Sequence, residues 1–147
     1  MSASLDILLV EDNPRDAEMT LRALRKGGVD STGILWVKDG VEALDYLCAT
    51  GIYSGRAGGH PKVVLLDLKL PKIDGFEVLE RLKNSEATRV IPVVVLTSSA
   101  EHRDVLESHR LMANSYIVKP VEYDSFVEAV GRAGIYWTRS NHLPYTR

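Results

Sequence analysis

Short apolar runs alternate with segments of helical periodicity along most of this chain, and this alternation restricts the fold more than any other feature. The runs that predict β-strands are Leu5–Val10, Ile34–Val37, Val63–Asp67, Val93–Thr97 and Ser115–Val118. In three of these runs apolar residues do not alternate with polar ones, which is typical of parallel strands covered on both faces. We therefore expect an α/β fold built on a doubly wound, five-stranded parallel sheet with right-handed crossovers.

Helix signals fill the intervals between these runs. Asn13, Asp39 and Asp74 each precede an apolar-periodic segment and can act as N-caps of the first three helices. A weaker fourth helix is predicted over about residues 101–111. The fifth carries an apolar stripe that consists of Phe126, Val130, Ala133 and Trp137.

The length and charge of the chain favour one soluble domain. We expect a single domain over residues 1–147, with a core of about 5–138 and a C-terminal tail of 139–147 that is too short for an output domain. A net charge of −2 gives no electrostatic reason to bind nucleic acid or an acidic membrane surface. No apolar stretch approaches the roughly 20 residues that span a bilayer. These features predict a soluble, cytoplasmic protein.

Cysteine and glycine usage excludes some other functions. The single cysteine, Cys48, cannot form an intrachain disulfide, and we expect it to be a small buried side chain on the inner face of the second helix. The segment Thr50–Pro61 is the one long loop, and its glycines do not open a helix after a strand as a P-loop requires. We expect this segment to be flexible or to contact a partner.

Polar side chains follow four of the predicted strands where each strand ends. The first run ends at Glu11–Asp12, the third at Asp67, the fourth at Thr97–Ser98 and the fifth at Lys119–Pro120. Because the carboxyl ends of parallel strands meet at one edge of a sheet, these side chains are expected to share one crevice.

The combination of residue types at this edge indicates phosphoryl chemistry. Carboxylates of Glu11, Asp12 and Asp67 repel one another and need a cation, and oxygen ligands beside a phosphate favour Mg²⁺. A carboxylate can also act as a nucleophile and form an acyl phosphate. The ammonium of Lys119 and the hydroxyl of Thr97 can then neutralise the phosphoryl oxygens.

Simpler readings of single residues are available, but they do not account for the set. A lone aspartate after a strand is usually a helix cap, as we expect for Asp39. A hydrolase with an aspartate nucleophile would need a second acid two residues later, where this chain has Lys69. A binding module that works without phosphorylation remains an alternative, although such a module is expected to lose one or more of the site residues.

Four blocks of sequence resemble the receiver domains of bacterial two-component response regulators. They are LLVEDNP (Leu8–Pro14), LLDLKLPKIDGFEVL (Leu65–Leu79), IPVVVLTSS (Ile91–Ser99) and ANSYIVKPV (Ala113–Val121), and they stand in the order and spacing of that family. The resemblance covers about residues 5–138. It implies a (βα)5 flavodoxin-like fold and a signalling protein, rather than a metabolic enzyme, that takes a phosphoryl group from a histidine kinase in a Mg²⁺-dependent reaction.

The resemblance also implies a role for each site residue. Asp67 would be the phosphoacceptor, modified to 4-aspartylphosphate. Asp12 would bind the metal directly, Glu11 through water, and the carbonyl of Lys69 would be a third protein ligand.

The remaining roles concern the phosphoryl group and the switch. By the same resemblance, Lys119 would pair with the phosphate and Thr97 would move toward it. Tyr116 would be the switch aromatic that follows Thr97. Pro120 would follow a cis peptide bond.

Within the family, the chain is similar to small regulators that partner phytochrome-type histidine kinases. The hints are the loop Thr50–Pro61, the phrase LDLKLPKIDG and an aromatic C-terminal end, Ile135–Trp137 followed by Leu143–Pro144. A different cognate kinase, or a role as a phosphate shuttle in a multistep phosphorelay, stays open. A homodimer through the fourth helix, fifth strand and fifth helix is expected, since that face would carry Tyr116.

Overall fold

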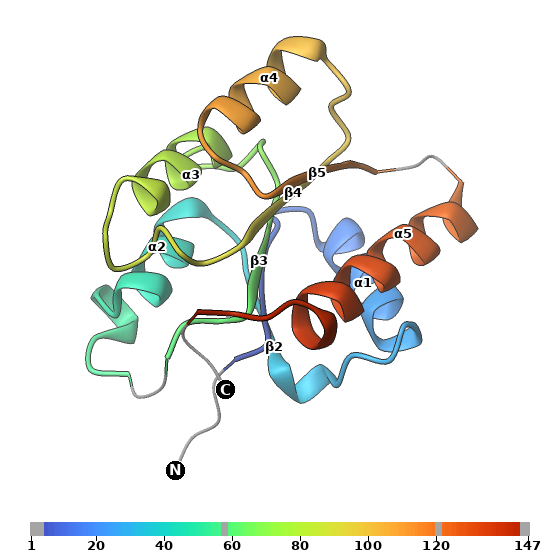
Figure 1. Cartoon of the computed structure of the whole chain (residues 1–147), viewed down its shortest axis with the longest axis horizontal. Helices are drawn as coiled ribbons and strands as arrows, with labels where there is room; N and C mark the ends of the chain where they lie inside the picture. Colours follow the sequence, from blue (N-terminus) through green and yellow to red (C-terminus); the bar gives the residue numbers. More distant parts are fainter. Residues whose placement is uncertain (1–4, 57–58, 120–121, 145–147) are drawn as a thin grey trace.

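A parallel sheet forms the centre of the molecule (Figure 1). The computed structural model describes residues 5–56, 59–119 and 122–144. Within these ranges the strand order is β2-β1-β3-β4-β5 and every pairing is parallel. The strands are β1 (Ile7–Val10), β2 (Ile34–Val37), β3 (Val63–Leu66), β4 (Val93–Thr97) and β5 (Ser115–Val118). This arrangement confirms the predicted fold class.

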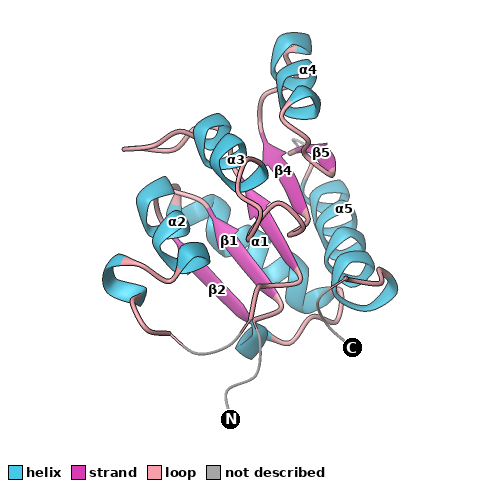
Figure 2. Ribbon diagram, turned by 60° about the vertical axis from the view of Figure 1, so that its left-hand side comes forward, coloured by secondary structure: helices cyan, strands magenta, loops and turns pink. Residues whose placement is uncertain are grey.

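Helices cover both faces of the sheet, which is why the central strands are apolar throughout (Figure 2). Helices α1 and α5 pack together on one face, and α2 and α3 lie on the other, with α4 beside α3. Their bounds are α1 Pro14–Lys26, α2 Gly40–Cys48, α3 Gly75–Lys83, α4 His102–Arg110 and α5 Tyr123–Ile135. Short helical turns occur at Ser31–Gly33, Gly51–Tyr53 and Tyr136–Ser140.

Two apolar layers hold these helices against the sheet. The layer under α1 and α5 includes Ala17, Leu24, Phe126 and Val130, all buried. Trp137, just beyond α5, is partly buried against the same layer, as the apolar stripe predicted. The opposite layer packs α2 and α3 on the sheet through Ala43, Leu47, Val78, Leu79 and Leu82.

The predicted N-caps are confirmed. The side chain of Asn13 accepts hydrogen bonds from the backbone N–H groups of Arg15 and Asp16, at 2.9 and 3.2 Å. The side chains of Asp39 and Asp74 each accept a hydrogen bond from the backbone N–H three residues later, at 2.8 and 2.9 Å. These bonds satisfy donors that the first helical turn leaves open, and so fix where each helix leaves the carboxyl edge of the sheet.

Gly75 allows α3 to start very close to the end of β3. A Cβ atom at Gly75 would lie 2.4 Å from the carbonyl oxygen of Asp67 and 2.5 Å from the Cα of Leu68. Real side chains do not tolerate such approaches, so glycine is needed at position 75, where α3 starts beside Asp67.

One expectation for the α2 region is corrected by the structure. Cys48 is exposed, not buried, because Ala43 and Leu47 form the inner face and Cys48 is the final helical residue, before Ala49 in a left-handed conformation at φ 54°. The described part of the segment that follows contacts α2, and the expectation of a flexible or partner-contacting loop stays a prediction. There Tyr53 donates a hydrogen bond to Glu42 at 3.0 Å, and the Arg56 guanidinium lies 4.1 Å from the centroid of the Tyr46 ring.

Within the part of the chain that the structure describes, no helix is long and apolar enough to cross a membrane.

Candidate functional site

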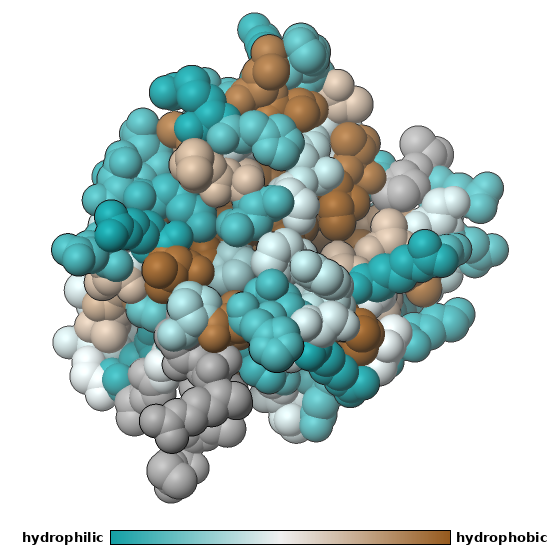
Figure 3. All heavy atoms as spheres, viewed as in Figure 1, coloured by the Kyte–Doolittle hydropathy of each residue, from teal (hydrophilic) through white to brown (hydrophobic). Residues whose placement is uncertain are grey.

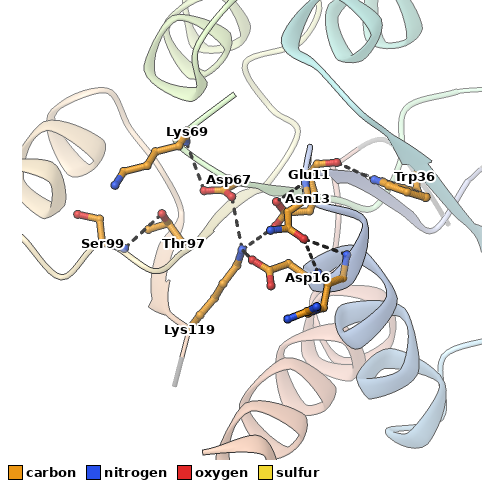
Figure 4. A network of polar contacts seen from close by, with 10 residues as sticks. Glu11, Asn13, Asp16, Trp36, Asp67, Lys69, Thr97, Ser99 and Lys119 are labelled. Atoms are coloured by element: carbon orange, nitrogen blue, oxygen red, sulfur yellow. Dashed lines mark hydrogen bonds and ion pairs between the residues drawn. The ribbon is translucent and has the colours of Figure 1, made fainter. Parts of the chain in front are cut away.

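The polar residues that follow the strands converge, as predicted, at the carboxyl edge of the sheet (Figure 4). Glu11 and Asp12 follow β1, and Asp67 follows β3 because β3 ends at Leu66. Ligand atoms of these three carboxylates all lie within 4.8 Å of one another. Glu11 is 2% exposed and Asp67 8%, whereas Asp12 is open to solvent. Such a donor set, composed of oxygen only and open on one side, fits a hard divalent cation.

Lys119, just past β5, bridges the carboxylates. Its Nζ lies 2.6 Å from Glu11 Oε1, 3.0 Å from Asp16 Oδ2 and 3.4 Å from Asp67 Oδ2. Burial alone lowers the pKa of Lys119, but the hydrogen bond to Glu11 and the charges of Asp67 and Glu11 outweigh it and raise the pKa above the usual value. Lys119 is therefore a fixed positive charge beside Asp67.

Glu11 is the most perturbed acid of the cluster. Burial is the largest cause, the hydrogen bond from Lys119 acts against it, and the negative charge of Asp67 adds to it, so that the pKa of Glu11 rises to about 7. The backbone around Glu11 is also tied down: its carbonyl accepts a hydrogen bond from the Trp36 indole N–H at 2.7 Å. A cation bound beside Glu11 would stabilise the charged form of this buried carboxylate.

This pKa predicts how the stability of the metal-free protein depends on pH. The pKa of Glu11 is near 4.5 unfolded and about 7 folded, so the folded state holds the proton more tightly. In EDTA, the free energy of unfolding should therefore fall as pH rises from about 4.5 to 7. Urea denaturation across this range, with Glu11→Gln as the comparison, tests it. The slope should be shallower in the variant, and equal slopes would contradict the assignment.

On the other side of Asp67 lies a second polar chain, at the end of β4. Thr97 is fully buried, and its hydroxyl accepts a hydrogen bond from the N–H of Ser99 at 3.4 Å. The Ser99 hydroxyl donates to Asp104 of α4 at 2.6 Å, and the Ser99 carbonyl accepts from the Tyr116 hydroxyl at 2.8 Å. Thr97, α4 and β5 are thus connected through one residue of the β4–α4 loop.

The other predicted site residues are placed as follows. The N–H of Lys69 donates to Asp67 Oδ1 at 3.3 Å, and its side chain is exposed. The metal role of the Lys69 carbonyl stays a prediction. Pro120, with its expected cis peptide bond, lies outside the described residues.

Sequence reasoning missed one member of the site, Asp16, in the first turn of α1. Its carboxylate approaches Lys119 at 3.0 Å, although the two residues are 103 positions apart in the chain. The available signal was its position, because Asp16 lies in the first turn of α1, which starts at the carboxyl edge of the sheet just after Glu11 and Asp12.

Fold and site together define a receiver: a doubly wound sheet that carries clustered carboxylates, a hydroxyl and a lysine at its carboxyl edge. The chain belongs to the response regulator receiver domain family, whose match covers residues 7–131. It is a signalling domain of two-component systems, and the acidic cluster of Glu11, Asp12 and Asp67 is a divalent-metal site.

Several characterised relatives cover nearly the whole chain. A probable methanogenesis regulatory protein, FilR2, from Methanothrix harundinacea is 42% identical over 94% of this chain and 86% of its own. The bacteriophytochrome response regulator AtBRR is 52% identical, covers 95% of this chain and 99% of its own, and superposes with a TM-score of 0.75. The Mn²⁺-bound response regulator Rcp1 of Synechocystis is 34% identical with 95% and 99% coverage and a TM-score of 0.84.

Proposed function

We propose that Asp67 accepts a phosphoryl group from the phosphohistidine of a sensor kinase, so that the protein acts as a single-domain response regulator in the cytoplasm. The observation that carries this proposal is the position of Asp67: its carboxylate shares the acidic metal cluster and lies 3.4 Å from the ammonium of Lys119. The nucleophilic oxygen thereby lies beside the positive charge of Lys119 and beside carboxylates that would hold a cation, and phosphoryl transfer requires positive charge around the transferring oxygens.

The chemistry assigned to each group follows from this placement. An oxygen of Asp67 attacks the phosphorus, the bond from phosphorus to the donor nitrogen breaks, and the histidine nitrogen leaves with its electron pair. Mg²⁺ held by Asp12, Asp67 and Glu11, with the Lys69 carbonyl as a further ligand, would supply positive charge to the transferring oxygens. Lys119 would pair with one of these oxygens, and the Thr97 hydroxyl would move to another.

Tyr116 would report the state of the site. Its hydroxyl is bonded to the carbonyl of Ser99, whose N–H is bonded to the Thr97 hydroxyl. A Thr97 hydroxyl drawn toward a phosphoryl group must give up or rearrange that contact. The loop that carries Ser99 would then shift the positions of α4 and Tyr116, which provides a two-state output.

Incubation with acetyl phosphate, in Mg²⁺ or in EDTA, tests the phosphoacceptor proposal. Intact mass should show one added phosphoryl group in Mg²⁺ and none in EDTA. Equal labelling in both would refute a metal-dependent site. Absence of labelling by acetyl phosphate and by a functional histidine kinase would favour the phosphorylation-independent binding module.

A phytochrome-type kinase is the proposed partner. The support is the similarity to AtBRR, whose name describes a bacteriophytochrome response regulator, while the similarity to FilR2 keeps other kinases in view. Purified bacteriophytochrome kinase should transfer its phosphoryl group faster than an unrelated kinase at equal concentration. Onward transfer to a histidine phosphotransfer protein would instead identify a phosphate shuttle.

We also propose that the protein forms a homodimer through α4, β5 and α5. Apolar side chains are exposed along these elements, with Leu106 55%, Val118 38% and Tyr123 43% exposed. In Figure 3 apolar surface gathers over α4 and near β5. Contiguous exposed apolar side chains commonly mark protein contacts.

Sedimentation of the Leu106→Glu variant tests this interface. A charge on α4 should raise the dimer dissociation constant about tenfold or more, because an unpaired charge would be buried on association. Ile52→Glu is the matched control, because Ile52 is 79% exposed and lies in the turn after α2. If the two variants dimerise as the wild type does, the contact lies elsewhere.

A further inference from the structure

Asp16 has a role that its place in α1 alone does not explain. An acidic residue in a first helical turn normally serves the helix dipole, or folds back onto the N-cap. Here Asn13 already caps the backbone N–H of Asp16 at 3.2 Å. The Asp16 carboxylate instead reaches across to Lys119 at 3.0 Å, and Figure 4 shows the two side chains directed at each other.

The contacts of Lys119 leave no free ammonium proton for a phosphoryl group. A protonated lysine has three N–H donors, and three carboxylates lie within 3.4 Å of Nζ. Asp16 is nearer than Asp67, 3.0 Å against 3.4 Å. A phosphoryl group on Asp67 can therefore form an ion pair with Lys119 only if one of the three carboxylates gives up its contact with the ammonium.

Of the three carboxylates that contact Lys119, Asp16 is the one that is connected to the site through Lys119 and not through the acidic cluster. Glu11 and Asp67 belong to the converging acidic cluster that fits a cation, and Asp16 does not. The Asp16 side chain is 36% exposed, so water can solvate it with or without the lysine. It can hold Lys119 in the resting state and still compete for it after phosphorylation.

We propose that Asp16 is a positioning residue that competes with the phosphoryl group on Asp67 for Lys119, and so limits how tightly the phosphorylated site is held. This inference rests on the proposed function of Asp67. The proposal predicts that Asp16 has opposite effects on the binding of the metal ion and of the phosphoryl group. Its negative charge beside the acidic cluster favours the metal ion, whereas its hold on Lys119 disfavours the phosphoryl group.

Asp16→Asn is the variant that tests the competition, with beryllium fluoride in Mg²⁺ as a phosphoryl analogue. The variant should bind beryllium fluoride about three- to fivefold more tightly, which is the upper part of the range for a partly exposed charged pair. It should bind Mg²⁺ alone more weakly, and its aspartyl phosphate should be lost more slowly. A merely structural defect would weaken both ligands, so the opposite signs are the diagnostic result.

Glu18→Gln is the matched control. Glu18 lies two residues further along α1 and pairs with Arg22 rather than with Lys119. Its substitution by glutamine removes the same charge as Asp16→Asn does. The control should leave both affinities within about twofold of wild type. If Asp16→Asn weakens beryllium fluoride binding, or if neither affinity changes, Asp16 does not compete for Lys119. A wild type that binds no beryllium fluoride and takes no phosphoryl group would overturn the proposed function itself, and this inference with it.

Discussion

Asp67→Asn is expected to abolish phosphoryl uptake. The amide oxygen of asparagine carries no negative charge and cannot form a stable acyl phosphate, whereas its size and shape match those of aspartate. Asp67 is 8% exposed and accepts the Lys69 N–H, a bond that an amide oxygen retains. The variant should therefore fold normally while its intact mass shows no phosphoryl group after acetyl phosphate and Mg²⁺.

Two further measurements make this test specific. Asp124→Asn, at an exposed position in the first turn of α5, should be labelled as fully as the wild type. Mg²⁺ affinity should fall in Asp67→Asn, because one of the three converging carboxylates is lost. Full labelling of Asp67→Asn would move the acceptor to another carboxylate, with Glu11 and Asp12 the candidates in the cluster.

Lys119→Met should produce the second large effect, a loss of stability whose size should depend on the metal. The side chain of Lys119 is 9% exposed and brings one positive charge into contact with Glu11, Asp16 and Asp67. Breaking a buried ion pair costs about 3–5 kcal/mol, and the partial exposure of Asp16 lowers our expectation to about 2 kcal/mol in EDTA. Mg²⁺ should recover much of this loss, since a cation replaces the missing positive charge, and should bind more tightly than to the wild type.

The phosphoryl reaction of Lys119→Met should behave oppositely. Loss of one preorganised positive group at a reacting oxygen typically slows transfer about 10²-fold or more, so labelling should fail although the metal binds better. Urea denaturation in EDTA and in Mg²⁺, together with the labelling rate, separates the two effects. Lys62→Met, which removes a lysine paired with Asp6 at the opposite edge of the sheet, should alter stability by less than about 1 kcal/mol in either condition. Equal stability of Lys119→Met and wild type in EDTA would contradict the bridging role.

Most of the fold and the core of the site were predictable because they depend on local patterns. Unbroken apolar runs indicated buried parallel strands, and in such a sheet the residues after each strand must meet at one edge. Glu11, Asp67 and Lys119 were thus brought together by topology alone, without knowledge of any contact.

Features that depend on side-chain direction were not predictable in this way. Asp16 was not among the predicted site residues, because its pairing with Lys119 depends on how α1 and the end of β5 are placed. Cys48 fits an apolar stripe by spacing, but the left-handed turn at Ala49 ends α2 there and leaves the thiol exposed. The hydrogen bonds from Tyr53 and Arg56 to Glu42 and Tyr46 of α2 also depend on side-chain direction, which periodicity does not register.

The bond between the Trp36 indole and the Glu11 carbonyl supplies the protein with its own optical probe. The indole is 2.7 Å from the backbone of a residue in the acidic cluster, so a cation that reorients Glu11 changes the polarity felt by this fluorophore. The only other tryptophan, Trp137, packs in the layer beside α5 and adds a constant background. Metal and phosphoryl titrations can therefore be followed by intrinsic emission, without any label, and Trp137→Phe would leave a single reporter at the site.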